Sequence, residues 1–148
     1  MKNKKIIIAG GTGFIGQEMI RYFGKDNNIV VLTRQSANTE NNRHHYSILV
    51  KEDLQNLRYV KWNGQSTGDW ASELEGADLL INLAGKTVNC RYTEKNKKEI
   101  FDSRTYAVDA LGLAIQQCIK PPALWINASS ATIYRHAADR PQDEDNGE

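Results

Sequence analysis

Glycines separate the first apolar run of the chain from its first amphipathic segment. The run from Lys4 to Ala9 is short, β-branched and almost continuously apolar, which is typical of a central parallel strand buried on both faces. Gly10, Gly13 and Gly16 follow with a G-x-x-G-x-x-G spacing. Glycine suits a strand–turn–helix transition, because the chain turns sharply and the helix packs closely on the strand. This feature predicts a Rossmann-type α/β fold.

The same segment predicts a site for a dinucleotide. The start of a helix presents unpaired N–H groups and the positive end of its dipole, and glycine lets a diphosphate approach the backbone. A glycine-rich turn can also serve only to reverse the chain, but the flanking strand and helix favour dinucleotide binding. No Gly-Lys-Ser/Thr follows, so the segment is not a Walker loop. The cofactor-binding residues expected here are Gly10, Gly11, Thr12, Gly13, Phe14, Ile15 and Gly16.

The rest of the chain alternates between apolar runs and amphipathic segments. Further strands are expected at residues 29–33, 57–62, 78–83 and 123–127. Their alternation with helical segments predicts parallel βαβ units and a doubly wound sheet flanked by helices. The polar stretch 35–42 is expected to be a surface loop. The stretch 46–54 is ambiguous between a short helix and irregular structure.

Apolar spacing indicates which side of each helix faces the core. The first helix is expected to turn Ile15, Met19, Tyr22 and Phe23 inward and to end at Gly24. The long helix that precedes the prolines at 121 and 122 is expected to turn inward Phe101, Val108, Leu111, Ile115 and Cys118.

Composition limits the classes of function. The 148 residues, 40% of them hydrophobic, are expected to form one domain with its own core. A net charge of +1 gives no reason to expect a nucleic-acid or membrane partner, and no apolar run reaches the roughly 20 residues that span a bilayer. Cys90 and Cys118 form no CxxC pair, so we expect a reduced, cytoplasmic protein. His44 and His45 lack the further ligands that a metal site needs.

The end of the second strand indicates which dinucleotide is preferred. NAD-specific folds have an acidic residue about 20 positions after the glycines, whereas an arginine there suits the 2′-phosphate of NADP. This chain has Thr33 and Arg34 at that place. A guanidinium can donate two hydrogen bonds to a phosphate, and Thr33 adds a hydroxyl. NADP is therefore favoured over NAD, although a solvated arginine at a strand end is the open alternative.

Several motifs occur in the order seen in extended short-chain dehydrogenases. GGTGFIG, INLAG and NASSATIY together resemble the NAD-dependent epimerase/dehydratase family. VLTR, WNG, INLAGKTV, RYT, SR and SSATIYRH are more narrowly similar to a bacterial branch of sugar-nucleotide epimerase-like proteins, some of them labelled cell-division inhibitors. The resemblance implies hydride transfer through NADP or NAD on a sugar nucleotide or similar hydroxyl compound. A homodimer is common among such proteins, and the sequence leaves the oligomeric state open.

The resemblance implies roles for four further residues. Ala84 and Gly85 contact the cofactor at the end of the fourth strand, or only let that strand end pack closely. Asn63 stands where related proteins have an acidic residue, and its amide oxygen accepts a bond from the adenine amino group. Ser130 is the catalytic serine, which donates a hydrogen bond to the substrate oxygen. Without the resemblance, a serine at a strand end is usually a cap or turn residue.

The family's general base has no counterpart in the sequence. That base is a tyrosine followed four positions later by lysine, whereas Asn96 follows Tyr92 and Ala110 follows Tyr106. We therefore expect residues 1–148 to be the NAD(P)-binding Rossmann domain of a longer enzyme, without its C-terminal substrate-binding part and inactive alone. The alternative is a non-catalytic NADP(H)-binding module that acts through a protein partner.

Overall fold

The computed structural model describes residues 1–34, 56–130, 135, 138–145 and 147. The elements, in chain order, are β1 (Lys5–Ala9), α1 (Phe14–Phe23), β2 (Asn28–Thr33), β3 (Leu57–Lys61), the 3₁₀ helix η1 (Asp69–Leu74), β4 (Leu79–Asn82), α3 (Glu94–Gln116) and β5 (Leu124–Asn127). The expected loop at 35–42, the ambiguous stretch 46–54 and the histidines at 44 and 45 lie outside the described residues.

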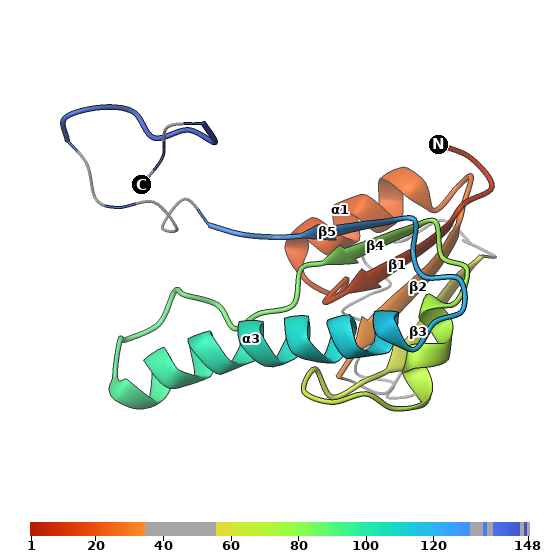
Figure 1. Cartoon of the computed structure of the whole chain (residues 1–148), viewed down its shortest axis with the longest axis horizontal. Helices are drawn as coiled ribbons and strands as arrows, with labels where there is room; N and C mark the ends of the chain where they lie inside the picture. Colours follow the sequence, from red (N-terminus) through yellow and green to blue (C-terminus); the bar gives the residue numbers. More distant parts are fainter. Residues whose placement is uncertain (35–55, 131–134, 136–137, 146, 148) are drawn as a thin grey trace.

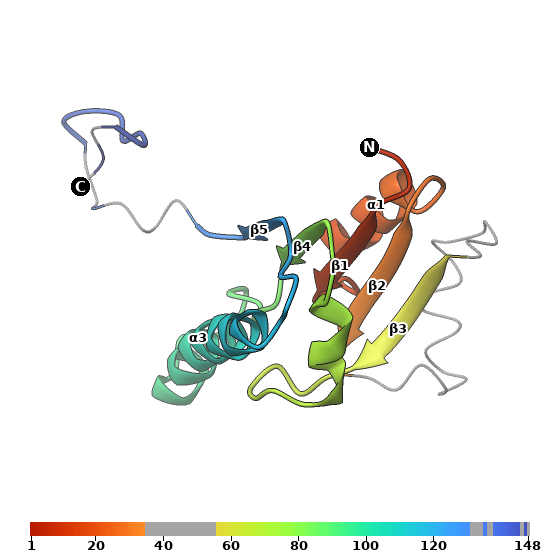
Figure 2. The ribbon, with the colours of Figure 1, turned by 45° about the vertical axis from the view of Figure 1, so that its right-hand side comes forward.

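The five strands form one parallel sheet in the order β3-β2-β1-β4-β5. Figure 2 shows α1 on one side of this sheet and α3 on the other. The predicted Rossmann-type, doubly wound architecture is therefore confirmed. The chain leaves β1 toward β2 and β3, then crosses back to β4 on the opposite side of β1. In open α/β sheets, ligands bind outside the carboxyl ends of the strands at such a reversal of strand order, which here lies between β1 and β4.

The central strands are buried on both faces, as their β-branched sequences predict. Ile6 and Ile8 pack with Ile20 of α1, whereas Ile7 and Ala9 belong to the cluster that contains Leu111 of α3. Successive side chains of a strand point to opposite faces. Each strand therefore contributes to two cores, one beneath each helical layer.

The inner face of α1 differs from the prediction. Met19 and Phe23 pack at the edge of the core, but Ile15 is 57% exposed and Tyr22 is 81% exposed. Gly16 and Ile20 are the buried residues of this helix. Because Gly16 has no side chain, the helix approaches the strand-end loop closely, and the face carrying Gly16 and Ile20 turns inward. As predicted, Gly24 ends the helix, and its N–H donates to the Ile20 carbonyl at 2.8 Å.

The inner face of α3 is built mainly from alanines, which the prediction overlooked. Leu111 is fully buried, as predicted, and Ile115 and Cys118 pack at the edge of the same cluster. Phe101 is 65% exposed, contrary to prediction, because the first half of α3 extends past the sheet (Figure 1). The small residues that lie against the sheet are Ala107, Ala110 and Ala114.

Candidate cofactor-binding site

The glycine loop and the end of β4 meet at the point where the strand order reverses. Gly10 follows β1 with a φ of +75°, a conformation that L side chains rarely adopt. A Cβ atom at Gly10 would lie 3.0 Å from both the Cα and the nitrogen of Ala84. The Gly10 N–H donates to the Leu32 carbonyl at 3.1 Å. The sequence-predicted residues Gly10 and Ala84 therefore lie in close contact at the carboxyl ends of β1 and β4.

The other glycines of the loop meet different surroundings. A Cβ at Gly16 would lie 2.4 Å from the Gly11 Cα, and one at Gly11 would lie 3.0 Å from the Val31 Cγ1. Both glycines serve the packing of the helix on the sheet. A Cβ at Gly13 would meet only the Gly10 carbonyl oxygen, at 3.6 Å. The space beside Gly13 is open, as the approach of a diphosphate to the backbone requires.

Helix α1 begins without a side-chain cap. Gly13 is its N-cap residue, and neither a side chain nor an acidic residue of the first turn neutralises the helix start. The first N–H groups of an α-helix have no partner within the helix, and they favour an anion. The side-chain amide of Gln17 holds the loop from behind by donating to the Thr12 carbonyl at 2.9 Å. Phe14 and Ile15 are exposed beside this N-terminus.

A buried amide fixes the end of β4. Asn82, only 3% exposed, accepts a hydrogen bond from the Ala84 N–H through Oδ1 at 3.0 Å. Its Nδ2 donates to Oδ1 of Asn127 at the end of β5, at 2.7 Å. The Asn82 side chain thereby provides a hydrogen-bond acceptor for the backbone of the turn after β4 and links the ends of β4 and β5. A polar residue that ends an apolar run is the sequence signal for such a side-chain role.

The segment after Gly85 is held by α3. The Lys86 N–H donates to the Ser103 hydroxyl at 2.9 Å, and Arg104 donates to the Lys86 carbonyl at 3.2 Å. The Lys86 ammonium pairs with Glu99, and the bond it donates lowers the pKa of that carboxyl. A Cβ at Gly85 would lie 3.3 Å from the Arg104 guanidinium carbon. These contacts set the path of Gly85, a predicted cofactor contact.

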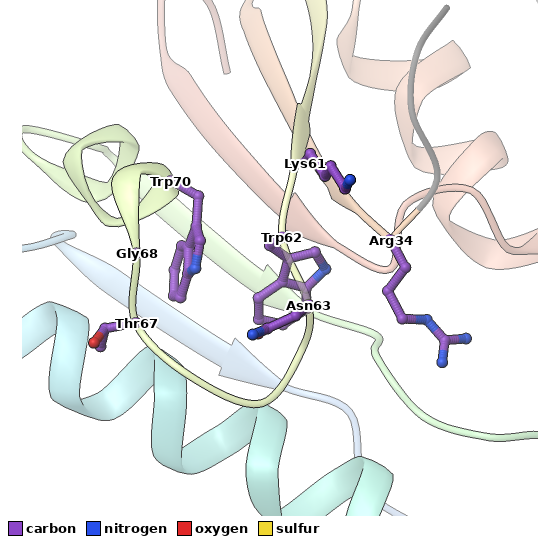
Figure 3. A pocket seen from close by; sticks show the side chains of 7 residues that line it. All are labelled: Arg34, Lys61, Trp62, Asn63, Thr67, Gly68 and Trp70. Carbon is purple, nitrogen blue, oxygen red and sulfur yellow. The ribbon is translucent and has the colours of Figure 1, made fainter. Parts of the chain in front are cut away.

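A hollow of about 440 Å³ lies at the carboxyl ends of β2 and β3 (Figure 3). It is lined by Arg34, Lys61, Trp62, Asn63, Thr67, Gly68 and Trp70. The rings of the two buried tryptophans meet edge to face, with 5.3 Å between their centroids. The Trp70 indole N–H donates to the Ser66 carbonyl at 3.2 Å. The hollow thus has a firmly held aromatic wall.

The hollow brings together Arg34 and Asn63, which sequence analysis placed near the adenosine. Thr33 is buried at the end of β2, and the exposed Arg34 follows it. Oδ1 of Asn63 accepts from the N–H groups of Gln65 and Ser66, at 2.8 and 3.0 Å. An amide oxygen has two lone pairs, and these two bonds use both of them in this conformation. Asn63 therefore shapes the turn that borders the hollow, and its bond to adenine stays a prediction.

Ser130 lies three residues beyond the end of β5. The Ala128 N–H still donates to the Asn82 carbonyl at 2.9 Å, which extends the pairing of β5 with β4. The chain then runs away from the body of the sheet, and Ser130 is exposed (Figure 1). Because β4 and β5 are parallel neighbours, the segment that carries Ser130 begins at the same end of the strands as the segment that carries Ala84 and Gly85. Residues 131–134 of the serine motif, including Tyr134, lie outside the described residues.

In the described part of the chain, no three His, Cys, Asp or Glu side chains form a group that could hold a metal ion. None of its helices has the length and apolar character required to cross a membrane.

Residues 6–148 match the NAD dependent epimerase/dehydratase family. The chain belongs to this family. The family's description names it as NAD dependent, so the chain belongs to a family that uses a dinucleotide cofactor.

Curated relatives extend the match at the level of sequence. The epimerase family protein YfhF of Bacillus subtilis is 34% identical over 144 residues, which cover 95% of this chain and 42% of YfhF. The epimerase family protein SSP1921 of Staphylococcus saprophyticus is 32% identical over 133 residues, covering 89% of this chain and 39% of that protein. The chain spans about two fifths of the length of these relatives.

Solved structures share the fold. A UDP-N-acetylglucosamine 4-epimerase from Methanobrevibacter ruminantium superposes with a TM-score of 0.72 at 21% identity, covering 99% of this chain and 44% of that one. A UDP-glucuronic acid 4-epimerase from Bacillus cereus, in complex with UDP-glucuronic acid and NAD, gives a TM-score of 0.69 at 16% identity, covering 95% and 44%. At these levels of sequence identity, the similarity shows a shared fold.

Proposed function

We propose that this chain is the dinucleotide-binding part of an NAD(P)-dependent enzyme that transfers hydride to and from a sugar nucleotide or similar hydroxyl compound. The observation that carries the proposal is the open backbone at Gly13, at an uncapped helix start beside the switch point. A diphosphate bound there receives N–H groups from the first turn of α1. Residues 1–148 then constitute the cofactor-binding domain.

The two halves of the cofactor extend from this point in opposite directions. The adenosine lies toward the hollow at the ends of β2 and β3, and the nicotinamide half lies toward Ala84 and Gly85 at the end of β4. The close approach of Gly10 and Ala84 supports this placement, because it brings the β4 end directly against the diphosphate loop. Arg34, at the adenosine end, favours the 2′-phosphate of NADP.

Ser130 is the proposed substrate-facing residue. Its hydroxyl donates a hydrogen bond to the substrate oxygen whose carbon exchanges hydride, and so stabilises the charge that develops there. When bound, the nicotinamide supplies the hydride acceptor and donor. Support comes from the emergence of Ser130 at the same sheet edge as Ala84. None of the six tyrosines is followed four positions later by lysine, so we expect no turnover of UDP- or TDP-sugars by the chain alone.

Calorimetric titration with NADPH and with NADH tests the proposal. Saturable binding of NADPH, tighter than that of NADH, is expected. Absence of heat with both nucleotides would overturn the assignment of the glycine loop. Tighter binding of NADH would leave the dinucleotide site standing and overturn the preference for NADP. Measurable conversion of a UDP-sugar by the 148-residue chain would contradict the expected lack of turnover.

A further inference from the structure

We infer that Lys61 is a specificity-determining residue that holds, together with Arg34, the 2′-phosphate of an adenosine in the hollow beside Trp62 and Trp70. The inference rests on the proposed dinucleotide function and adds a residue that the sequence analysis did not select. It assigns the preference for the phosphorylated ribose to two neighbouring strands instead of to one arginine.

The strand register brings the two cations to one edge. Thr33 of β2 pairs with Lys61 of β3, and the Trp62 N–H donates to the Thr33 carbonyl at 3.0 Å. Neighbouring strands lie about 4.8 Å apart. Arg34 and Lys61 therefore leave adjacent strand ends, and both line the hollow. In the view of Figure 3, their side chains lie on the same side of Trp62, away from Trp70.

The charge of the hollow is unbalanced. Its lining includes two cations and no carboxylate. Among the described residues, neither Arg34 nor Lys61 has an acidic partner, whereas Arg58 on the same strand as Lys61 pairs with Glu73 through both terminal nitrogens. Two unneutralised cations create a local positive potential that favours a doubly charged anion. A phosphate monoester carries nearly two negative charges at neutral pH.

The wall of the hollow suits a planar base attached to that phosphate. Trp62 and Trp70 are buried and held edge to face, so their position is set before any ligand arrives. The turn between them is fixed by the two N–H bonds that Asn63 accepts and by Gly64, whose φ is +72°. Aromatic side chains provide apolar contact area with little entropy to lose. An adenosine with a phosphate on its ribose matches this combination of wall and charge.

The two cations differ in what they add. The planar guanidinium of Arg34 can donate two parallel hydrogen bonds to one phosphate, whereas the Lys61 ammonium is a point charge on a flexible stem. Loss of the Lys61 charge therefore weakens binding of the 2′-phosphate without affecting the rest of the nucleotide. Replacement by arginine keeps that charge and is expected to keep most of the affinity.

The test compares adenosine 2′,5′-bisphosphate with adenosine 5′-monophosphate, by titration of the chain and of four variants, one of them Lys61→Arg. Lys61→Gln is expected to weaken bisphosphate binding about tenfold, the loss associated with one charge-assisted hydrogen bond, and monophosphate binding less than about twofold. Arg34→Gln is expected to show the same selectivity. Lys120→Gln, at the opposite edge of the sheet where Lys120 lies against Gly76, is the matched control and is expected to change neither affinity.

The outcomes separate this inference from the function on which it rests. Failure of the unaltered chain to bind NADPH or NADH would overturn the proposed function. If the unaltered chain binds NADPH but Lys61→Gln keeps its affinity for both adenosine nucleotides, or loses affinity for both equally, the role of Lys61 is overturned and the proposed function stands. Recovery of bisphosphate affinity in Lys61→Arg would confirm that the charge matters. Circular dichroism of each variant shows whether the fold is intact, and Lys61 is exposed at the end of an edge strand.

Discussion

Gly16 packs so closely against Gly11 that a Cβ atom on Gly16 would lie 2.4 Å from the Gly11 Cα. Two non-bonded carbon atoms do not approach so closely. The atoms in the way belong to the Gly11 backbone, which cannot rotate aside as a side chain can. The contact therefore sets how deeply α1 sits on the sheet, and with it the position of the helix start beside the reversal of strand order.

The substitution Gly16→Ala is expected to destabilise the fold. The added methyl group has to push α1 away from the loop, and overpacking of this kind costs about 1–3 kcal/mol of unfolding free energy. Urea unfolding followed by circular dichroism measures the loss. Gly13→Ser is the control, because serine is a favourable N-cap residue and its Cβ at Gly13 would meet only the Gly10 carbonyl oxygen, at 3.6 Å. Equal stability of the two variants would contradict the packing role of Gly16.

The substitution Gly13→Asp separates binding from folding. The carboxylate occupies the space beside the helix start and repels a diphosphate, so NADPH binding is expected to be lost. Aspartate is a favourable N-cap residue, and Gly13 has a φ of −76° that L residues adopt readily. The unfolding free energy is therefore expected to change by less than about 1 kcal/mol. Calorimetry with NADPH, together with thermal unfolding, checks both expectations. Undiminished NADPH affinity would show that the diphosphate binds elsewhere.

Replacement of Arg34 by alanine is expected to reduce the preference for NADPH. Loss of a charged hydrogen bond costs about 1.5–3 kcal/mol, so NADPH affinity falls by a factor of about ten to one hundred while NADH affinity changes little. Arg34→Lys keeps the charge but not the fork, and an intermediate loss is expected. The dissociation constants of both nucleotides are the measurement. An equal loss for NADPH and NADH is the result that contradicts this assignment.

Asp78 is expected to make stability depend on pH in the acid range. The Lys5 N–H and then the Lys4 ammonium, each donating at 2.9 Å, lower the pKa of Asp78 below its ordinary value of 3.8. The contribution to stability is present above the unfolded-state pKa and is lost as the pH falls through the lower folded-state pKa. Asp78→Asn is therefore expected to be less stable than the parent chain at pH 7.

That difference should shrink as the pH falls below 3.8, because the carboxyl of the parent chain then becomes protonated. Urea unfolding at several values of pH measures it. Asp145→Asn, near the end of the chain, is the control and is expected to match the parent chain at every pH. A difference between Asp78→Asn and the parent that stays constant down to pH 2 would contradict the role of the Asp78 charge.

The sheet was predictable because its signals are local. The apolar run before Gly10 and the polar residues that end the later runs gave the strands to within one residue at each end. The glycine spacing indicated the turn after β1, and the structure gives separate reasons for two of its glycines, the positive φ of Gly10 and the close packing of Gly16. The role of Gly13 in admitting a diphosphate stays a prediction.

The inner faces of the helices were less predictable. Hydrophobic spacing selects large residues, but the close approach of α1 depends on Gly16 and that of α3 on Ala107, Ala110 and Ala114. Small residues bring a helix near its neighbour without contributing to an apolar pattern. Ile15 was wrongly expected to face the core because the depth at which α1 sits on the sheet depends on tertiary packing. Phe101 was wrongly expected to do so because the first half of α3 extends past the sheet.

The candidate site shows the same division. Arg34 was found from its distance in sequence to the glycines, whereas Lys61 became visible only through its register opposite Thr33. Trp62 and Trp70 lie eight positions apart, and their ring contact depends on the turn at Asn63 and Gly64. Contacts of this kind, between neighbouring strands or across a turn, cannot be predicted from the spacing of residues in one sequence.

The bond between Asn82 and Asn127 has a consequence for strand alignment. A slip of β5 by one residue against β4 would reverse which side chains face each layer and would leave the buried Asn82 amide without its partner. The hydrogen bond between the two asparagines thus favours a single register of β5 against β4. Since Ser130 follows Asn127 by three positions, the same register sets the point at which the serine segment leaves the sheet.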